Sequence, residues 1–268
     1  MNNSDQFSNS WAIILGGSSG FGFAAVEKLA RHGMNIVVLY REMAITEKPL
    51  KEKFQQIAKI NGVEIMPFNI NALEVTGITA FMTQFAHNKT KCVKVLLHSI
   101  ARGNLKPLSS DDLTGESEVL SEVDISYTTH AMATSLLDWV RAILKAGLFE
   151  DDARIIGLTS EGAHKYWPSY AAVSIAKASL ESLKTYMAVE FSKYGLKTNL
   201  IQAGITETPS LMKIEGSDKL INVAKERNPF GRITTPADVA NVIYLLCTDE
   251  ATWINGSVIH VDGGEHCI

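Results

Sequence analysis

The chain has 268 residues, of which 46% are hydrophobic and 20% charged, and its net charge is −4. This composition excludes a disordered, collagen-like or coiled-coil chain, and the charge gives no reason to expect a nucleic acid as partner. Three cysteines without C-x-x-C spacing argue against a disulfide framework or a cysteine-based zinc site, and the histidines show no metal-ligand spacing. No secretory signal and no run of ~18–20 apolar residues is visible, so we expect a cytoplasmic protein without a membrane span.

Short apolar runs alternate with amphipathic segments along the chain. Apolar runs without polar alternation are what a parallel sheet covered on both faces requires. They predict seven strands, at Trp11–Leu15, Asn35–Tyr40, Val63–Phe68, Val93–His98, Ala153–Leu158, Lys197–Gln202 and Ser257–Val261. Helical patterns lie between them, at Gly20–His32, Leu50–Asn61, Val75–His87, Glu118–Lys145, Ser169–Lys193 and Pro236–Cys247. This order predicts one α/β domain over residues 1–268, a doubly wound Rossmann-type fold with a seven-stranded parallel sheet and helices on both faces.

Two connections are longer than loops usually are. Residues 102–117 follow the fourth predicted strand, and residues 203–222 follow the sixth. Ligands of such sheets bind beyond the carboxyl ends of the strands, so both segments are candidate walls of a pocket. Residues 1–10 are expected to form a flexible N-terminus.

A glycine cluster stands between the first predicted strand and the first predicted helix. Glycines at such a turn allow the backbone to approach a pyrophosphate, and the N-terminus of the following helix attracts the anion. The spacing is G-x-x-x-G-x-G rather than G-x-G-x-x-G. We therefore predict a dinucleotide site that includes Gly16, Ser18, Ser19, Gly20, Phe21 and Gly22.

The end of the second predicted strand bears on the choice of dinucleotide. An NAD enzyme usually carries an acidic residue there, which binds the adenosine ribose hydroxyls. This strand ends in Tyr40 and Arg41, and the Arg41 guanidinium could pair with a 2′-phosphate. Glu42 follows directly, and Arg41 could instead be a solvated surface charge. We predict NADPH as cofactor in preference to NADH.

A tyrosine and a lysine lie seven residues apart in the predicted helix Ser169–Lys193. This spacing puts Tyr170 and Lys177 on one face, about 10 Å apart along the axis. Together with Gly16–Gly22 and the Val-Asp-Gly-Gly stretch 261–264, the pair resembles the short-chain dehydrogenase/reductase superfamily over nearly the whole chain. The resemblance implies that Tyr170 is the catalytic acid and that Lys177 binds the nicotinamide ribose.

The spacing refines the resemblance. Ketone-reducing members place the tyrosine four residues before the lysine, where this chain has Val173. The seven-residue spacing is similar to that of the enoyl-acyl-carrier-protein reductases, as are the stretches Leu97–Ala101, Asp124–Ser126 and Ile201–Thr208. This resemblance implies further cofactor contacts from Asn69 and Ile70 near adenine and from Ser99, Ile100, Ala101, Gly204, Ile205 and Thr208.

Two features depart from the usual enoyl reductase pattern. The glycine loop keeps the ordinary superfamily spacing, and Ser160 stands where many enoyl reductases carry a second tyrosine. Carbonyl-reducing members keep a catalytic serine at this position. The combination resembles an NADPH-using branch of the bacterial enoyl reductases, and Ser160 could be a second hydrogen-bond donor or a plain structural serine.

The sequence thus predicts NADPH-dependent reduction of the trans-2 double bond of an enoyl thioester. Segment 203–222 would be a flexible apolar lid over the acyl chain, and Lys213, Lys219, Lys225 and Arg227 could dock an acidic acyl carrier protein. The resemblance also implies a homotetramer that associates through Glu118–Lys145 and Ser169–Lys193. Two alternatives stay open, a carbonyl or 3-oxoacyl reductase and a non-catalytic NADPH-binding regulator.

Overall fold

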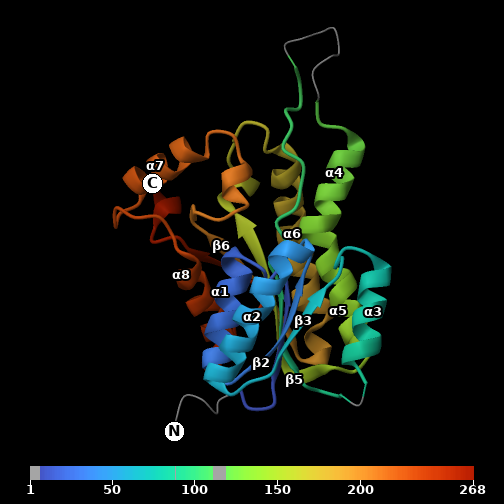
Figure 1. Cartoon of the computed structure of the whole chain (residues 1–268). Helices are drawn as coiled ribbons and strands as arrows, with labels where there is room; N and C mark the ends of the chain where they lie inside the picture. The colour runs from blue at the N-terminus through green and yellow to red at the C-terminus, as the bar shows by residue number, and fades with distance from the viewer. Residues whose placement is uncertain (1–6, 88, 111–118) are drawn as a thin grey trace.

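The computed structural model describes residues 7–87, 89–110 and 119–268, which form a three-layer α/β fold (Figure 1). The central sheet has seven parallel strands in the order β3-β2-β1-β4-β5-β6-β7. The strands are β1 (Trp11–Leu15), β2 (Asn35–Tyr40), β3 (Ile65–Asn69), β4 (Val93–His98), β5 (Phe149–Ser160), β6 (Leu196–Ala203) and β7 (Val258–Val261). The predicted fold class is confirmed, and each strand contains most of the predicted apolar run.

Helices cover both faces of the sheet. They are α1 (Gly20–Arg31), α2 (Ala44–Asn61), α3 (Val75–Phe85), α4 (Glu122–Thr129), α5 (Ser135–Lys145), α6 (Ala171–Glu190), α7 (Ser217–Arg227) and α8 (Pro236–Cys247). Side chains of α1, α2 and α8 form one core with the sheet, and side chains of α3, α5 and α6 form the other. Every residue of β1 is buried, because β1 lies inside the sheet and one of the two cores covers each of its faces. Within the described part of the chain, no helix is long and apolar enough to cross a membrane.

The predicted helix Glu118–Lys145 is not continuous. Glu118 lies outside the described residues, and α4 begins at Glu122 because Ser121 and Asp124 form a capping box. A π-helical turn over His130–Thr134 then separates α4 from α5. Such a turn inserts one residue into the helical repeat, which the regular spacing of apolar residues does not reveal. It places Ala131 and Met132 against α6.

The other predicted helix boundaries need three corrections. The helix predicted from Ser169 to Lys193 begins at Ala171 and ends at Glu190. It cannot include Ser169, because this residue has a left-handed φ of +58° that no α-helix accommodates. Helix α2 starts six residues before the predicted Leu50 and carries Pro49 in its second turn. The predicted lid 203–222 contains the short helix η4 (Leu211–Lys213) and the first residues of α7.

The described part of the N-terminal segment is packed on the domain. Phe7 is buried and makes an edge contact with Tyr244 of α8, and the Ser10 hydroxyl donates to Glu150 of β5. Residues 1–6 of the segment predicted to be flexible lie outside the described residues.

Candidate active site

The glycine loop lies at the point where the strand order reverses. β1 pairs with β2 on one side and β4 on the other, so the loops after β1 and β4 meet above the sheet. Gly16 has a φ of +85°, and a Cβ on it would lie 2.6 Å from the Ser99 carbonyl oxygen. The first turn of α1 carries no acidic residue, and no side chain caps its amide groups. This cradle fits a dinucleotide pyrophosphate, and Ser18, Ser19, Gly20, Phe21 and Gly22 are all within it.

The predicted adenosine contacts come together at the ends of β2 and β3. Arg41 is exposed directly after β2. The Asn69 amide is bound to the Glu42 backbone, since its oxygen accepts from the Glu42 N–H at 3.0 Å and its nitrogen donates to the Glu42 carbonyl at 2.9 Å. The Ile70 N–H donates to the Tyr40 carbonyl. Asn69 therefore fixes the loop that carries Arg41, and its oxygen keeps one lone pair for a ligand.

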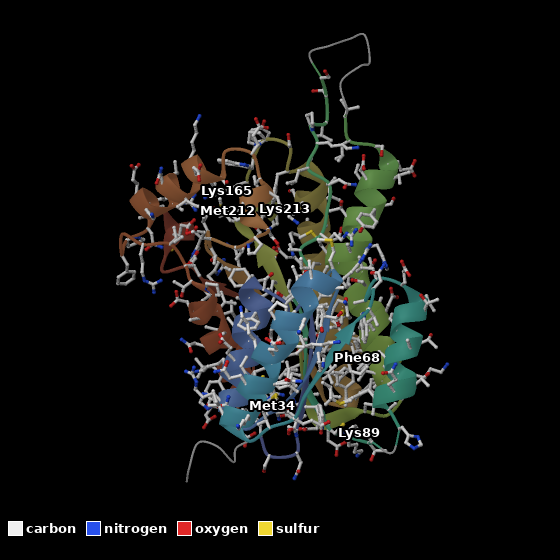
Figure 2. All side chains as sticks on the ribbon, viewed as in Figure 1. Met34, Phe68, Lys89, Lys165, Met212 and Lys213 are labelled. Carbon is white, nitrogen blue, oxygen red and sulfur yellow. The ribbon has the colours of Figure 1, made fainter. Side chains whose placement is uncertain are left out.

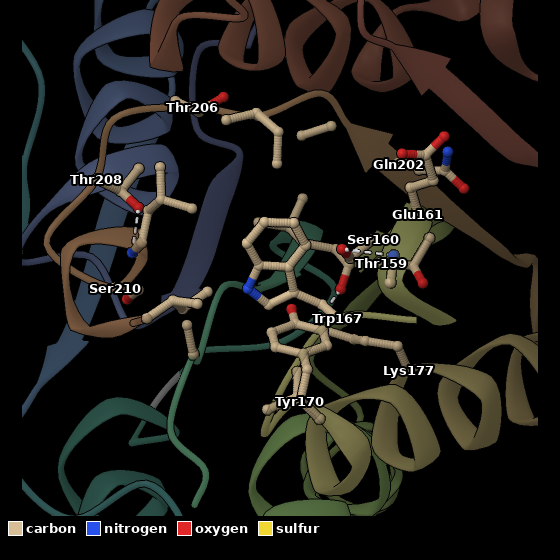
Figure 3. A pocket seen from close by; sticks show the side chains of 18 of the residues that line it. Thr159, Ser160, Glu161, Trp167, Tyr170, Lys177, Gln202, Thr206, Thr208 and Ser210 are labelled. Carbon is tan, nitrogen blue, oxygen red and sulfur yellow. Dashed lines mark hydrogen bonds between the residues drawn. The ribbon is translucent and has the colours of Figure 1, made fainter. Parts of the chain in front are cut away.

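The predicted catalytic and nicotinamide-side residues line one cleft of about 270 Å³ (Figure 3). Of the predicted residues, the cleft is lined by Phe21, Ser99, Ile100, Ala101, Ser160, Tyr170, Lys177, Gly204, Ile205 and Thr208. Its apolar wall consists of Leu105, Met132, Val173, Leu211, Ile214 and Leu220. One cleft thus holds the predicted polar groups together with an apolar surface that suits a hydrocarbon group.

Tyr170 is the residue before α6, and its ring packs on Gly162. A Cβ on Gly162 would lie 2.6 Å from the ring, so this position keeps the ring in place. Burial raises the pKa of Tyr170, and a hydrogen bond with Ser160 opposes the increase. Burial is the larger of the two effects. Tyr170 is therefore a neutral hydroxyl donor near pH 7, with the Ser160 hydroxyl beside it.

Lys177 is a buried cation aimed at the end of β5. Its ammonium donates to the Leu158 carbonyl at 2.6 Å. Burial lowers the pKa of Lys177 to about 8, and the charge of Glu181, one helical turn further, opposes this decrease. Glu181 itself accepts from Thr159 and contacts His164, so it also joins α6 to the segment that carries Ser160.

The loop after β6 forms the opposite side of the cleft. The Thr208 hydroxyl accepts from the Leu211 N–H at 3.2 Å and so orients η4. A Cβ on Gly20 would lie 3.4 Å from the Thr208 methyl, which shows that this loop and the glycine loop face each other. Of the apolar lid residues, Leu211, Ile214 and Leu220 line the cleft, whereas Met212 is 51% exposed.

An ion-pair network in the cleft was missed by the sequence analysis. Arg227, at the end of α7, donates to Glu161 at 2.6 Å and to Glu265 at 3.1 Å. Glu161 directly follows Ser160, and Glu265 directly follows the Val-Asp-Gly-Gly stretch, so both adjoin recognised motifs. The prediction that Arg227 belongs to a docking surface is wrong, because its charge is turned inward and paired. Lys213, Lys219 and Lys225 are exposed.

The side chains of His98 and His130 have hydrogen-bond partners within the fold. His98 is buried, its Nε2 lies 2.9 Å from the Ser135 hydroxyl, and burial lowers its pKa to about 3. His130 Nε2 lies 3.0 Å from the Leu73 carbonyl oxygen. Among the described residues, no three His, Cys, Asp or Glu side chains gather in a way that could hold a metal ion.

Fold and cleft together define the class of protein: a Rossmann-type domain with a glycine loop suited to a dinucleotide and a cleft that holds a tyrosine and a lysine. The family model described as enoyl-(acyl carrier protein) reductase matches residues 16–266, and the chain belongs to this family. It is an NAD(P)H-dependent oxidoreductase of the short-chain dehydrogenase/reductase superfamily.

Relatives and solved structures agree with this assignment. The chain is 30% identical over 220 residues to an enoyl-acyl-carrier-protein reductase (NADH) of Buchnera aphidicola, with 80% of each chain covered. It is 28% identical over 260 residues to the 1-cyclohexenylcarbonyl-CoA reductase of Streptomyces collinus, over 94% of this chain and 85% of the relative. The crystal structure of the enoyl-acyl-carrier-protein reductase (NADH) from Aquifex aeolicus superposes with a TM-score of 0.81 at 25% identity, over 98% of both chains.

Proposed function

We propose that this enzyme reduces the trans-2 double bond of an enoyl thioester with NADPH. The observation that carries the proposal is that Tyr170, Ser160 and Lys177 line one cleft together with apolar side chains. Both kinds of relative named above reduce enoyl thioesters, one on an acyl carrier protein and one on coenzyme A, so either carrier is compatible with the family.

Each group in the cleft has a separate role in the proposed reaction. The bound cofactor supplies the hydride. Lys177 holds the nicotinamide ribose, and its positive charge favours the negative charge that develops on the substrate. The neutral Tyr170 hydroxyl donates a hydrogen bond to the thioester oxygen as that oxygen becomes an enolate, with Ser160 as a second donor. The α-carbon of the enolate then takes up one proton, which comes from solvent and completes the reduction. The apolar wall excludes water, which strengthens both interactions.

The preference for NADPH rests on the end of β2. Arg41 is an exposed cation at the position where an NAD enzyme would carry a carboxylate, and Asn69 holds its loop through the Glu42 backbone. We expect kcat/KM with NADPH to exceed that with NADH, and Arg41→Ala to lower only the NADPH value, by about tenfold. Equal values for both cofactors in the wild type would contradict this preference.

A direct assay tests the reaction. NADPH oxidation is followed with crotonyl-CoA, which carries a trans-2 double bond, and with acetoacetyl-CoA, which carries a ketone. We expect turnover of crotonyl-CoA. Turnover of acetoacetyl-CoA alone would instead establish a carbonyl reductase, the second candidate, which Ser160 favours.

Val173 is the observation against that second candidate. It occupies the position of the tyrosine in ketone-reducing members, is buried, and packs with Met132 and Ala176. A carbonyl reductase would have to use Tyr170 from a different place.

A further inference from the structure

Trp167 carries a buried hydrogen-bond donor without a partner. It lies three residues before Tyr170 and lines the same cleft (Figure 3). Its indole Nε1 is covered by protein, yet it makes no hydrogen bond within the part of the chain that the structure describes. A buried donor without a partner destabilises the fold, so such a group calls for an explanation.

The surroundings of the indole do not provide an acceptor. In Figure 3 the indole nitrogen is turned toward the side of the cleft on which Thr208 and Ser210 lie. On this side the Thr208 hydroxyl accepts from the Leu211 N–H and is not bonded to the indole, and the adjoining wall includes the apolar Leu211 and Ile214. A partner for the indole N–H therefore has to enter between Trp167 and this loop.

The backbone fixes Trp167 relative to the proton donor. The Trp167 carbonyl accepts from the Tyr170 N–H at 3.2 Å, and Ser169 between them has a φ of +58°. This turn holds the two aromatic side chains in a set relation. An acceptor bound by Trp167 is consequently placed at a defined distance from the group bound by Tyr170.

Trp167 lies where the cleft meets the surface. Its neighbour Tyr166 is 88% exposed, and Lys165 and Lys213, both exposed, line the same opening (Figure 2). A thioester substrate that enters here would place its acyl group in the interior of the cleft and its carrier arm at the opening of the cleft, beside Lys165 and Lys213. A hydrocarbon acyl group contains no hydrogen-bond acceptor, and the thioester oxygen accepts from Tyr170 in the proposed reaction. The next acceptor along the substrate is the amide carbonyl nearest to the sulfur in the pantetheine arm.

We propose that Trp167 is a substrate-binding residue whose indole N–H donates to this amide carbonyl of the pantetheine arm, after the loop around Leu211 lifts. The amide is common to coenzyme A and acyl carrier protein thioesters, so Trp167 recognises the arm and not the carrier. The proposal rests on the proposed function.

Three thioesters and two variants test it. Crotonyl-CoA and the crotonyl thioester of N-acetylcysteamine contain the amide, and the crotonyl thioester of ethanethiol does not. Trp167→Phe keeps a ring and removes the N–H. It is expected to raise KM about five- to tenfold for both amide-containing substrates, with kcat nearly unchanged, and to leave the ethanethiol thioester unaffected. Tyr166→Phe, the exposed neighbour, is the matched control and is expected to behave as the wild type with all three.

Other results would overturn the proposal. Unchanged KM values in Trp167→Phe, or equal losses with all three substrates, would reduce Trp167 to a packing role. If the wild type reduces none of the thioesters, the proposed reaction fails, and calorimetric binding of butyryl-CoA then decides the inference. Binding that is five- to tenfold weaker in Trp167→Phe supports it, whereas equal binding or none refutes it.

Discussion

At the scale of single residues, burial controls the protonation of the two central groups. Tyr170 stays neutral because burial raises its pKa, so in the proposed reaction we expect it to be a hydrogen-bond donor and not an anion. Tyr170→Phe is expected to lower kcat with crotonyl-CoA by about 10²–10⁴-fold. The dissociation constant for NADPH, measured by cofactor fluorescence, should not change, because the hydroxyl acts mainly in the transition state. A variant that keeps more than a tenth of wild-type kcat would show that another group is the donor.

Lys177 links activity and stability to pH. Its folded-state pKa of about 8 lies below the ordinary 10.5, so its charge is present below pH 8 and is lost above it. We expect kcat to fall as pH rises through about 8. Below pH 8 Lys177 is charged in the folded protein, and its burial then lowers the free energy of unfolding. Between about pH 8 and 10.5 the unfolded chain still binds the proton while the folded protein has lost it. The free energy of unfolding therefore rises with pH in this range, until the destabilisation has disappeared.

The same pKa predicts a stabilising but inactive variant. Lys177→Met should raise the free energy of unfolding at pH 7 by roughly 1–3 kcal/mol, because the buried charge is removed. Loss of the hydrogen bond to the Leu158 carbonyl reduces this increase. Thermal unfolding of this variant and of Lys145→Met, an exposed control on α5, measures the difference. Equal or lower stability of Lys177→Met relative to the control would contradict the assignment of a buried charge.

At the scale of elements, Arg227 connects three segments that form the cleft. It joins α7 to Glu161 after β5 and to Glu265 near the C-terminus, and Glu265 also accepts from the Ile205 N–H of the loop after β6. Arg227→Ala leaves Glu265, which is 2% exposed, without its cation. Removing one partner of such a pair typically costs up to about 3–5 kcal/mol.

We therefore expect Arg227→Ala to lower Tm by several degrees and to raise KM for crotonyl-CoA several-fold, because α7 loses its attachment to the cleft. Lys225→Ala, an exposed neighbour on the same helix, is the control and should change neither value. Wild-type KM and Tm in Arg227→Ala would show that the network does not position α7.

At the scale of the whole molecule, apolar side chains are exposed on α4 and α6. Val123 is 77% exposed, Tyr186 65% and Val189 70%. Exposed apolar side chains on these two helices are compatible with association between copies of the chain. We expect a homotetramer, with light scattering giving a mass about four times 29.3 kDa. Val189→Glu should lower the measured mass, whereas Lys59→Met, an exposed position on α2 outside both predicted contact helices, should not. A monomeric wild type would refute the expectation.

The sheet, and the presence of Tyr170 and Lys177 in one cleft, were predictable because their signals are local. Each strand is an apolar run, the glycine loop adjoins the first of them, and Tyr170 and Lys177 share one segment of chain. The break at His130–Thr134 was not predictable in this way, because a single inserted residue leaves both flanking helical patterns intact. The start of α6 was not predictable either. Ser169 has a left-handed backbone conformation, which in sequences is usually indicated by a glycine, and here the residue is a serine.

The amino-acid order by itself determined the parallel α/β fold, the dinucleotide loop and the tyrosine–lysine pair, since these depend on residues close together along the chain. Only the tertiary structure decided how charges are paired. Arg154 reads as an interruption of an apolar run, yet it is 1% exposed and binds Asp152 through both of its terminal nitrogens. Arg227 reads as a surface cation, yet it pairs with carboxylates 66 and 38 residues away. Burial and pairing depend on which distant segments meet, and no local pattern contains that information.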